Sequence, residues 1–375
     1  MAIDNKDKKI LNVPHLRFPE FSGEWVTCTL GDITSSFNLR NKDEVPYPMY
    51  SVTNNRGFIP QSEQFEDREM IGEDAKAYKI IHKDDFAYNP ARINVGSIAK
   101  YNGVHPCMIS SLYVCFKAGL QVDKDWLMQL LKTSKMNFYY NINGEGGVRV
   151  YLFYPNFARI RTSYPATLTE QKKIAHFLSL LDERIATQNK IIEKLQSLIK
   201  GLAVQLTQSG TPNIRLCDCL ECHSSTLQEN CVSVTGSYPV YGATGLIGYT
   251  NNYAYNGESI LIVKDGSGVG SLSYVNDHFS VIGTLNYLTA KENYSILYLY
   301  YALMAFNFTP YITGMAIPHI YFKDYGKAKL FYPSIEKRIR IASLLHNIDQ
   351  KLVAEQNLVI SLSAQKSYLL RMLFI

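Results

Sequence analysis

The sequence predicts an α+β fold in which two mixed α/β domains are separated by two long antiparallel helices that form a coiled coil. Two observations predict this arrangement. Apolar residues recur at steps of four and three along two long segments, and the second segment repeats the first. A fainter repeat between the two domains adds a pseudo-twofold internal relationship. We expect segment boundaries at 1–164 (with an N-terminal arm), 165–210, 211–332 and 333–375.

The first long segment, 167–208, predicts a helix that lies against another helix. Thr167, three residues before Glu170, is a capping box that marks its start, and Gly210 and Pro212 mark its end. At 1.5 Å per residue the helix is about 60 Å long, so it must project from a domain. One polar residue, Gln188, interrupts the seam. The apolar seam positions are Ile174, Leu178, Leu181, Ile185, Ile192, Leu195, Ile199, Leu202 and Leu206.

The second seam lies 167 residues after the first, as Ile341 follows Ile174 and Glu355 follows Gln188. Its polar break therefore repeats as well. Because the chain order is domain, helix, domain, helix, packing along a shared seam requires the second helix to run back antiparallel to the first. The apolar positions of this seam are Ile341, Leu345, Ile348, Leu352, Val359, Leu362, Leu369 and Leu373.

The two domains repeat each other less closely. Tyr47-Pro48-Met49-Tyr50 corresponds to Tyr238-Pro239-Val240-Tyr241, and Val95-Gly96-Ser97 corresponds to Val269-Gly270-Ser271. In the first domain, β-rich runs separated by Gly, Asn and Pro predict short strands near 25–30, 97–101 and 111–116. One helix is expected near 125–137. Residues 1–24 predict an extended arm that packs on this domain.

Composition limits the class of protein. With 46% apolar residues the chain can bury real cores, and its net charge of +5 is compatible with a polyanionic partner. The N-terminal residues are polar and predict no signal peptide, and the apolar run 296–308 is too short to span a bilayer. Seven cysteines, an odd number, indicate reduced thiols. We expect a cytoplasmic protein without membrane contact.

The sequence predicts no catalytic residues. An amino-methyltransferase needs an Asp/Asn-Pro-Pro-aromatic loop, whereas Asn89-Pro90-Ala91-Arg92 lacks the second proline and the aromatic residue. No glycine-rich cofactor turn follows a strand and opens a helix, and no GxxxxGK[ST] motif for ATP is present. Intrinsic methylation and ATP hydrolysis by this chain are therefore not expected.

The cysteines at 217–231 form an unusual cluster with one histidine. Four thiols and an imidazole could hold zinc, but C-x-C-x2-C-H is not a standard pair of knuckles. The alternation of Cys217 and Cys219 also suits an edge strand. We predict ordinary buried cysteines and no metal site, with a zinc–thiolate site as the alternative. The residues concerned are Cys217, Cys219, Cys222, His223 and Cys231.

Polar residues on glycine-rich turns between β runs are candidates for contacting DNA. Asn can pair with adenine and Arg with guanine in the major groove, and such side chains often lie on loops. The alternative is that the glycines only permit tight hairpins, with the polar residues structural. The candidates are Asn89, Arg92, Asn94, Arg149 and Tyr151 in the first domain, and Lys264, Asp265, Ser267, His319 and Tyr321 in the second.

Three stretches carry a family resemblance: VPHLRFPEFSGEW, LGDI and PATLTEQKKIAHFLSLLDERI. Together they resemble the specificity subunit of a type I restriction–modification system, over the whole chain. The second helix departs from this pattern, because PSIEKRIRIASLL lacks the Glu-Gln pair and one residue. The family's fold consists of two target-recognition domains with a central and a C-terminal conserved helix.

The resemblance implies a non-catalytic, sequence-specific subunit that binds double-stranded DNA. Each domain would read one half of a bipartite gapped site, and the coiled coil would set the gap and dock the methyltransferase subunits. Restriction subunits would join through the complex. The chain would bind no cofactor, whereas S-adenosylmethionine, ATP and magnesium would act on the partners. Alternatives are an orphan DNA-binding module without catalytic partners and a purely structural coiled-coil adaptor.

Overall fold

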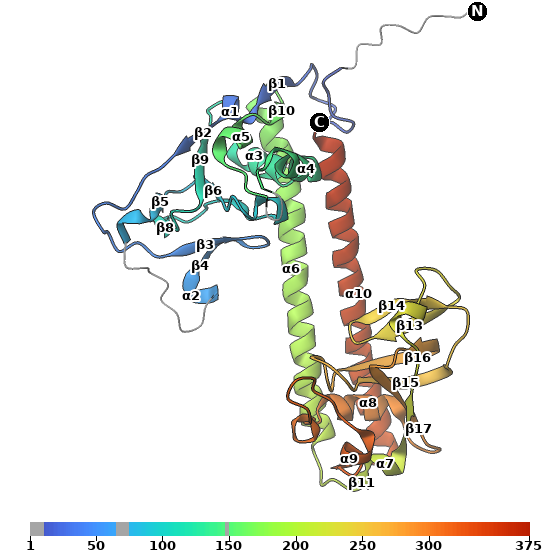
Figure 1. The fold of residues 1–375 in the computed structure, drawn as a ribbon. Helices are drawn as coiled ribbons and strands as arrows, with labels where there is room; N and C mark the ends of the chain where they lie inside the picture. Colours follow the sequence, from blue (N-terminus) through green and yellow to red (C-terminus); the bar gives the residue numbers. More distant parts are fainter. Residues whose placement is uncertain (1–10, 65–74, 147–149) are drawn as a thin grey trace, which may run out of the picture. The chain divides into compact units, whose positions relative to one another are not determined.

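The computed structural model describes residues 11–64, 75–146 and 150–375, which divide into two compact units (Figure 1). Unit 1 consists of Met1–Ala186 and Ile360–Ile375, and unit 2 consists of Thr187–Val359. Each unit therefore combines one mixed α/β region with part of both long helices. In the described part of the chain, no helix has both the length and the apolar character that a membrane span needs.

The two predicted long helices are present as α6 (Leu168–Thr207) and α10 (Ile335–Leu373), with 40 and 39 residues. Every seam position predicted from the sequence is buried or partly buried, whereas the positions between them are mostly exposed. This is the pattern expected when one narrow apolar stripe of each helix faces the other.

The direction of packing is antiparallel in each unit. In unit 1 the first turns of α6 share a core with the last turns of α10, through Ile174 and Leu369 among others. In unit 2 the last turns of α6 share a core with the first turns of α10, through Ile199 and Ile341 among others. The predicted antiparallel pairing is therefore confirmed within each unit.

The polar breaks of the two seams meet. Gln188 and Glu355 are only 8% and 7% exposed, and the Gln188 side-chain amide donates a hydrogen bond to the Glu355 carboxylate. Lys351, one turn earlier on α10, forms an ion pair with the same carboxylate. A polar pair inside an apolar seam favours the register in which both partners are satisfied. Each residue thus contacts its own repeat counterpart.

A second repeated position is used differently in the two units. In unit 1, Asp182 pairs with Lys366 and accepts a hydrogen bond from Gln129 at 3.2 Å. Its counterpart in unit 2, Asp349, is half-buried and accepts a 3.4 Å hydrogen bond from the Tyr301 hydroxyl. Burial raises the pKa of Asp349, while that hydrogen bond and the nearby His346 act in the opposite direction.

The α/β part of unit 1 is built from small antiparallel sheets around an aromatic core. A four-stranded sheet has the order β2-β9-β6-β7, and β1-β10, β3-β4 and β5-β8 form two-stranded sheets. The strands are β1 (Val26–Thr29), β2 (Thr34–Phe37), β3 (Tyr50–Thr53), β4 (Gly57–Pro60), β5 (Lys79–Ile81), β6 (Phe86–Tyr88), β7 (Ile98–Lys100), β8 (Cys107–Ile109), β9 (Val114–Ala118) and β10 (Arg161–Tyr164).

The helix expected near 125–137 is two helices. Thr133 ends the first, because its hydroxyl donates to the Leu130 carbonyl at 2.8 Å, and it begins the second by accepting from the Met136 amide at 3.2 Å. The helices of unit 1, besides the long ones, are α1 (Leu30–Ile33), α2 (Gln61–Gln64), η1 (Ala75–Ala77), η2 (Ile93–Val95), α3 (Lys124–Leu131), α4 (Ser134–Asn143) and α5 (Tyr154–Ala158).

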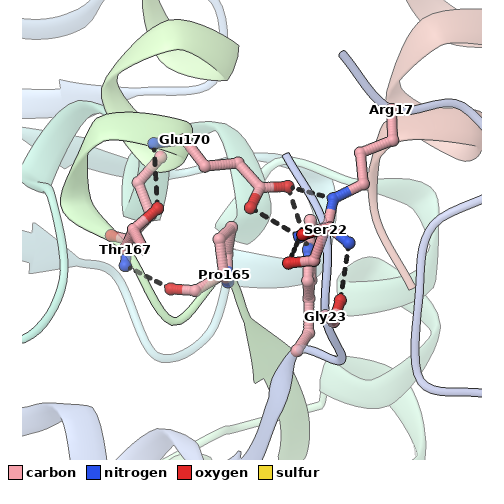
Figure 2. Close-up of polar contacts among 8 residues, drawn as sticks. Arg17, Ser22, Gly23, Pro165, Thr167 and Glu170 are labelled. Atoms are coloured by element: carbon pink, nitrogen blue, oxygen red, sulfur yellow. Dashed lines mark hydrogen bonds and ion pairs between the residues drawn. The ribbon is translucent and has the colours of Figure 1, made fainter. Parts of the chain in front are cut away.

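The N-terminal arm packs on unit 1, as predicted, and it is held at the start of α6 (Figure 2). The Arg17 guanidinium makes two 2.8 Å contacts with the Glu170 carboxylate, which is 2% exposed, and the Trp25 indole donates to the same carboxylate at 3.2 Å. The Thr167 hydroxyl accepts from the Glu170 amide at 3.4 Å, which is one half of the predicted capping box. The Glu170 side chain instead anchors the arm.

Unit 2 carries a larger sheet of six strands in the order β12-β17-β15-β16-β13-β14, in which only the β13–β16 pair is parallel. A two-stranded sheet joins β11 and β18. Its elements are β11 (Ile214–Arg215), α7 (Leu216–Cys219), β12 (Leu220–Ser224), η3 (Glu229–Cys231), β13 (Tyr238–Gly242), β14 (Gly245–Thr250), β15 (Tyr255–Val263), β16 (Leu272–Val281), β17 (Leu285–Ala290), α8 (Ile296–Met304), η4 (Thr309–Tyr311), α9 (Phe322–Tyr325) and β18 (Lys329–Leu330).

The predicted repeat between the domains is visible in the order of elements. In both units a two-stranded sheet leads through a one-turn helix, α1 or α7, into a strand of a larger sheet. The Tyr-Pro motifs lie at hairpins, β3–β4 in unit 1 and β13–β14 in unit 2. The prediction that Cys217 and Cys219 lie on an edge strand is wrong, because both residues lie on α7.

We predict that the Gln188–Glu355 pair governs register more than stability. The single substitution Gln188→Leu leaves a buried carboxylate without its amide partner and should lower the free energy of unfolding by about 1–3 kcal/mol. The double substitution Gln188→Leu with Glu355→Leu should recover most of that loss, since an apolar pair continues the seam. Urea denaturation of both variants measures this. A double variant as unstable as the single one would contradict the prediction.

We predict opposite effects for the same substitution at the two repeated aspartates. Because the pKa of Asp349 is raised by burial, folding favours its protonated form, and its stabilising contribution is lost as pH rises through that pKa. Asp349→Asn should therefore raise the free energy of unfolding at neutral pH, with a gain that shrinks in acid. Asp182→Asn, the matched control, removes an ion pair with Lys366 and should lower it by about 1 kcal/mol or less. Denaturation over a pH series tests both. Shifts of the same sign would refute the prediction.

Candidate nucleic-acid interface

The first candidate loop of unit 1 closes the hairpin between β6 and β7. The Asn89 amide donates to the Ser97 carbonyl at 3.0 Å, and the Asn89 side-chain oxygen accepts from the Ala91 amide at 3.0 Å. Gly96 closes the turn with a φ of +99°, a conformation that residues with a side chain adopt at a cost. The loop is therefore a fixed turn that presents Arg92 to solvent.

The second candidate loop of unit 1 lies against the first. The Leu152 amide donates to the Pro90 carbonyl at 3.0 Å, and Glu145 and Tyr151 exchange two backbone hydrogen bonds of 2.8 Å. Tyr151 is 38% exposed at this edge. The structure thus brings together two loops that the sequence predicted separately. Arg149, another predicted residue, lies outside the described residues.

Unit 2 repeats this arrangement. The loop after β15 and the segment before α9 are joined where the Ile320 amide donates to the Lys264 carbonyl at 2.9 Å. The Gly266 amide donates to the Pro318 carbonyl at 2.9 Å, and Asp265 and His319 form an isolated antiparallel bridge. The contact from Ile320 to Lys264 in unit 2 corresponds to the contact from Leu152 to Pro90 in unit 1.

The candidate side chains of unit 2 form a mixed polar and aromatic surface. The Lys264 ammonium lies 4.0 Å from the Asp265 carboxylate, and Ser267 is exposed at the tip of the turn. The His319 and Tyr321 rings are in edge contact with centroids 5.1 Å apart. The ammonium of Lys323 lies 5.1 Å from the Tyr321 ring centroid. Cations and exposed rings of this kind can contact phosphates and base faces.

In unit 1 the candidate loop borders a polar cavity of about 470 Å³. Asn89 and Arg92 line it together with Asn54, Asn55 and Arg56, which form the turn between β3 and β4. Sequence reasoning did not select these three residues. In the sequence these residues appear only as a polar turn, Asn54-Asn55-Arg56-Gly57, between two β-rich runs. Such a turn is typical of any hairpin, so it does not indicate a functional site.

Asn94 takes a different position from its neighbours. Its side-chain amide donates to the Asn141 side-chain oxygen of α4 at 3.0 Å, and it lines a separate cavity of about 570 Å³ in the same unit. This contact gives Asn94 a structural role in holding the loop to α4. Asn89 and Arg92 are therefore the two predicted residues of this loop that share one cavity.

The cysteines of unit 2 are free thiols. Within the described residues, no three His, Cys, Asp or Glu side chains lie close enough together to hold a metal ion. Burial raises the pKa of Cys222 to about 11 and that of Cys219 to about 12. The His223 ring stacks on Tyr287 at 4.7 Å and bonds to the Thr289 hydroxyl at 2.9 Å. Of these four cysteines Cys219 is buried, Cys217 and Cys222 are half-buried and Cys231 is exposed, so the prediction of buried cysteines is right for Cys219 and wrong for Cys231.

A family model described as the type I restriction modification DNA specificity domain matches residues 214–362. Residues 214–362 are therefore similar to the DNA specificity domain of type I restriction–modification systems. The matched segment takes in the α/β part of unit 2 and most of α10. The match confirms the resemblance noted from the sequence motifs. It is independent of the helix motif at 165–185, which lies outside the matched segment.

Known specificity subunits are similar in part of their length. The chain is 29% identical over 112 residues to the EcoprrI specificity subunit of Escherichia coli, covering 30% of this chain and 28% of that protein. It is 30% identical over 133 residues to a type I specificity subunit of Mycoplasma pneumoniae, covering 33% of this chain and 42% of that protein. The chain thus matches well under half the length of these relatives.

Solved structures show the same fold over nearly the whole chain. The S subunit of a type I restriction–modification system from M. genitalium superimposes with a TM-score of 0.67, at 16% identity, over 97% of this chain and 99% of its own. A second chain, from a study of complex assembly in a type I system, gives a TM-score of 0.54 at 14% identity over 92% and 96%. The predicted fold class is confirmed.

We predict that the turn glycines are required for the loop geometry. Gly96→Ala places a side chain at positive φ and within 3.4 Å of the Asn54 carbonyl oxygen, so it should lower the free energy of unfolding by about 1–2 kcal/mol. Gly270→Ala, at φ +86° beside Phe308, should do the same in unit 2. Thermal or urea denaturation provides the comparison.

The control is Gly201→Ala on α6, where an added Cβ would meet no atom within 4 Å. It should instead raise the free energy of unfolding by about 0.5–1 kcal/mol, because alanine favours the helix. A stabilising effect at Gly96 would contradict the loop conformation described here.

Proposed function

We propose that the chain is the DNA-reading, non-catalytic subunit of a type I restriction–modification complex, in which each unit reads one half of a bipartite gapped site. The observation that carries the proposal is the duplicated loop arrangement. In both units a turn at the end of a hairpin is joined by backbone hydrogen bonds to the segment that precedes a short helix. Two similar scaffolds with different loop side chains suit two different half-sites.

Recognition of a DNA half-site would combine two kinds of contact. Lysine and arginine side chains neutralise phosphates and set the register on the duplex, and loop side chains then discriminate between base edges. Unit 1 offers Arg92 and Asn89, and unit 2 offers Lys264 and Ser267, on turns whose backbone is fixed. A fixed turn loses little freedom on binding, which favours affinity and discrimination.

The helix pair would act as the spacer between the half-sites and as the docking surface for the methyltransferase subunits. Its seam is continuous along both helices, and most of the charged residues outside the seam are exposed. S-adenosylmethionine, ATP and magnesium would be bound by the methyltransferase and restriction partners. The missing methyltransferase and ATP motifs in this sequence support a non-catalytic role.

We predict that shortening the helices by one heptad changes the gap. Deleting Gln188–Lys194 together with Glu355–Ser361 removes about 10 Å from each helix while preserving the phase of the seam. Methylome sequencing of cells that express this variant with its methyltransferase subunit should show a gapped motif with the same halves and a shorter gap. The same experiment on the unmodified chain, against its deletion, tests whether the motif depends on this chain.

The length-matched control is Ile360→Ala, at an exposed position inside one of the deleted segments, which keeps both helices at full length and leaves the Gln188–Glu355 pair intact. Its gap should equal that of the unmodified chain. An unchanged gap in the heptad deletion would refute the spacer role. A motif that persists without the chain would refute the recognition role.

A further inference from the structure

The polar cavity of unit 1 contains recognition groups that the fold itself does not use. Among the described residues, no hydrogen bond or ion pair engages the Arg92 guanidinium or the side-chain amides of Asn54 and Asn55. Asn89 uses its side-chain oxygen within the loop, which leaves its NH₂ group free to donate. Arg92 and Asn55 are exposed and Asn54 is half-buried, so these donors are accessible to an external ligand at the wall of the cavity.

The walls of the cavity are held by hydrogen bonds between side chains and backbone, of which the one from Ser97 to Val52 is buried. The Ser97 hydroxyl donates to the Val52 carbonyl at 2.7 Å, which ties the β6–β7 hairpin to strand β3. The Thr53 hydroxyl donates to the Gly57 carbonyl at 3.0 Å and accepts from the Arg56 amide at 3.2 Å, which closes the facing turn. Two turns that are distant in sequence are therefore held in a defined relation, as a pre-organised site requires.

The chemistry of the lining distinguishes between classes of ligand. Only Val52 and Tyr113 contribute apolar or aromatic character, whereas pockets for small molecules are lined mainly by apolar groups. The lining contains no carboxylate, which excludes a site built for cations. Arg56 is paired with Glu63 at 2.8 Å, but both side chains are at least half exposed, so this pair is weak.

We propose that this cavity reads the major-groove edge of purines, with Arg92 pairing to the O6 and N7 acceptors of a guanine and Asn54 or Asn55 reading the adjoining base. This inference rests on the proposed function and adds the base chemistry of one half-site. A guanidinium offers two parallel donors to a guanine edge, which is the commonest specific contact in protein–DNA complexes. The half-site read by unit 1 therefore contains a guanine.

The test is methylome sequencing of cells that express the methyltransferase subunit with the full chain or with Arg92→Gln. Discrimination at one G·C pair of one half-site should fall roughly ten- to hundredfold, while the other half-site and the gap stay unchanged. Asn55→Ala should relax an adjoining position of the same half-site. The control Arg159→Gln removes an exposed arginine of unit 1 that does not line the cavity, and its motif should match the unmodified chain.

A binding experiment tests the contact with the guanine N7 atom directly. The purified complex of chain and methyltransferase subunit is titrated with a duplex that carries 7-deazaguanine at the guanine identified above. The analogue lacks N7, so binding by the unmodified complex should weaken roughly tenfold, and binding by the Arg92→Gln complex should not change further.

The outcomes separate this inference from the proposed function. If the unmodified chain yields no gapped motif, both fail. If it yields a motif that Arg92→Gln leaves intact, or weakens equally in both half-sites, only the purine-reading cavity fails. Relaxation at a position that holds no guanine also overturns it. A folded Arg92→Gln chain with no methylation at any site would assign Arg92 to DNA positioning instead.

Discussion

The apolar seam shared by the two long helices is the constraint on which the rest of the molecule depends. Because the second helix repeats the first, the same heptad positions must be buried on both, and antiparallel packing brings Gln188, at the centre of the seam, to its own repeat counterpart Glu355. The contact between Gln188 and Glu355 is the direct result. A polar pair at that point is satisfied in one register, whereas a purely apolar seam would tolerate slippage by a heptad.

Away from the centre the two copies of the helix have diverged. Glu170 holds Arg17 of the N-terminal arm, whereas the counterpart Lys337 bonds to the Ser209 hydroxyl and lies over the Phe331 ring. Asp182 is paired with Lys366, whereas its counterpart Asp349 is half-buried under Tyr301. The duplicated seam is retained because it fixes packing, and the flanking positions adapt to different neighbours in each unit. The two helices therefore share the same apolar seam but differ in the residues that flank it.

Elements with a long periodic pattern could be predicted from the sequence. Features whose position depends on a single side-chain contact could not. The seams were predictable because nine apolar positions of the first helix and eight of the second recur with one period. The break at Thr133 was not, since the apolar spacing around it continues and only the side-chain hydrogen bonds end the helix. Cys217 and Cys219 alternate in a way that suits a strand, yet one helical turn buries Cys219. Asn54 and Arg56 were missed because their position beside Arg92 depends on tertiary contacts such as Ser97 to Val52.

The same distinction explains how the side chains of the candidate loops can differ between the units while the scaffold is kept. The candidate loops are held by main-chain hydrogen bonds, from Leu152 to Pro90 in unit 1 and from Ile320 to Lys264 in unit 2. Main-chain bonds place few demands on side-chain identity, apart from glycines such as Gly96 and Gly270 where φ is positive. Residues such as Arg92 and Ser267 can therefore change without loss of the turn. In the proposed DNA-reading role, such a fold would separate the groups that specify a DNA sequence from the groups that specify the structure, and each half-site could vary independently of the other.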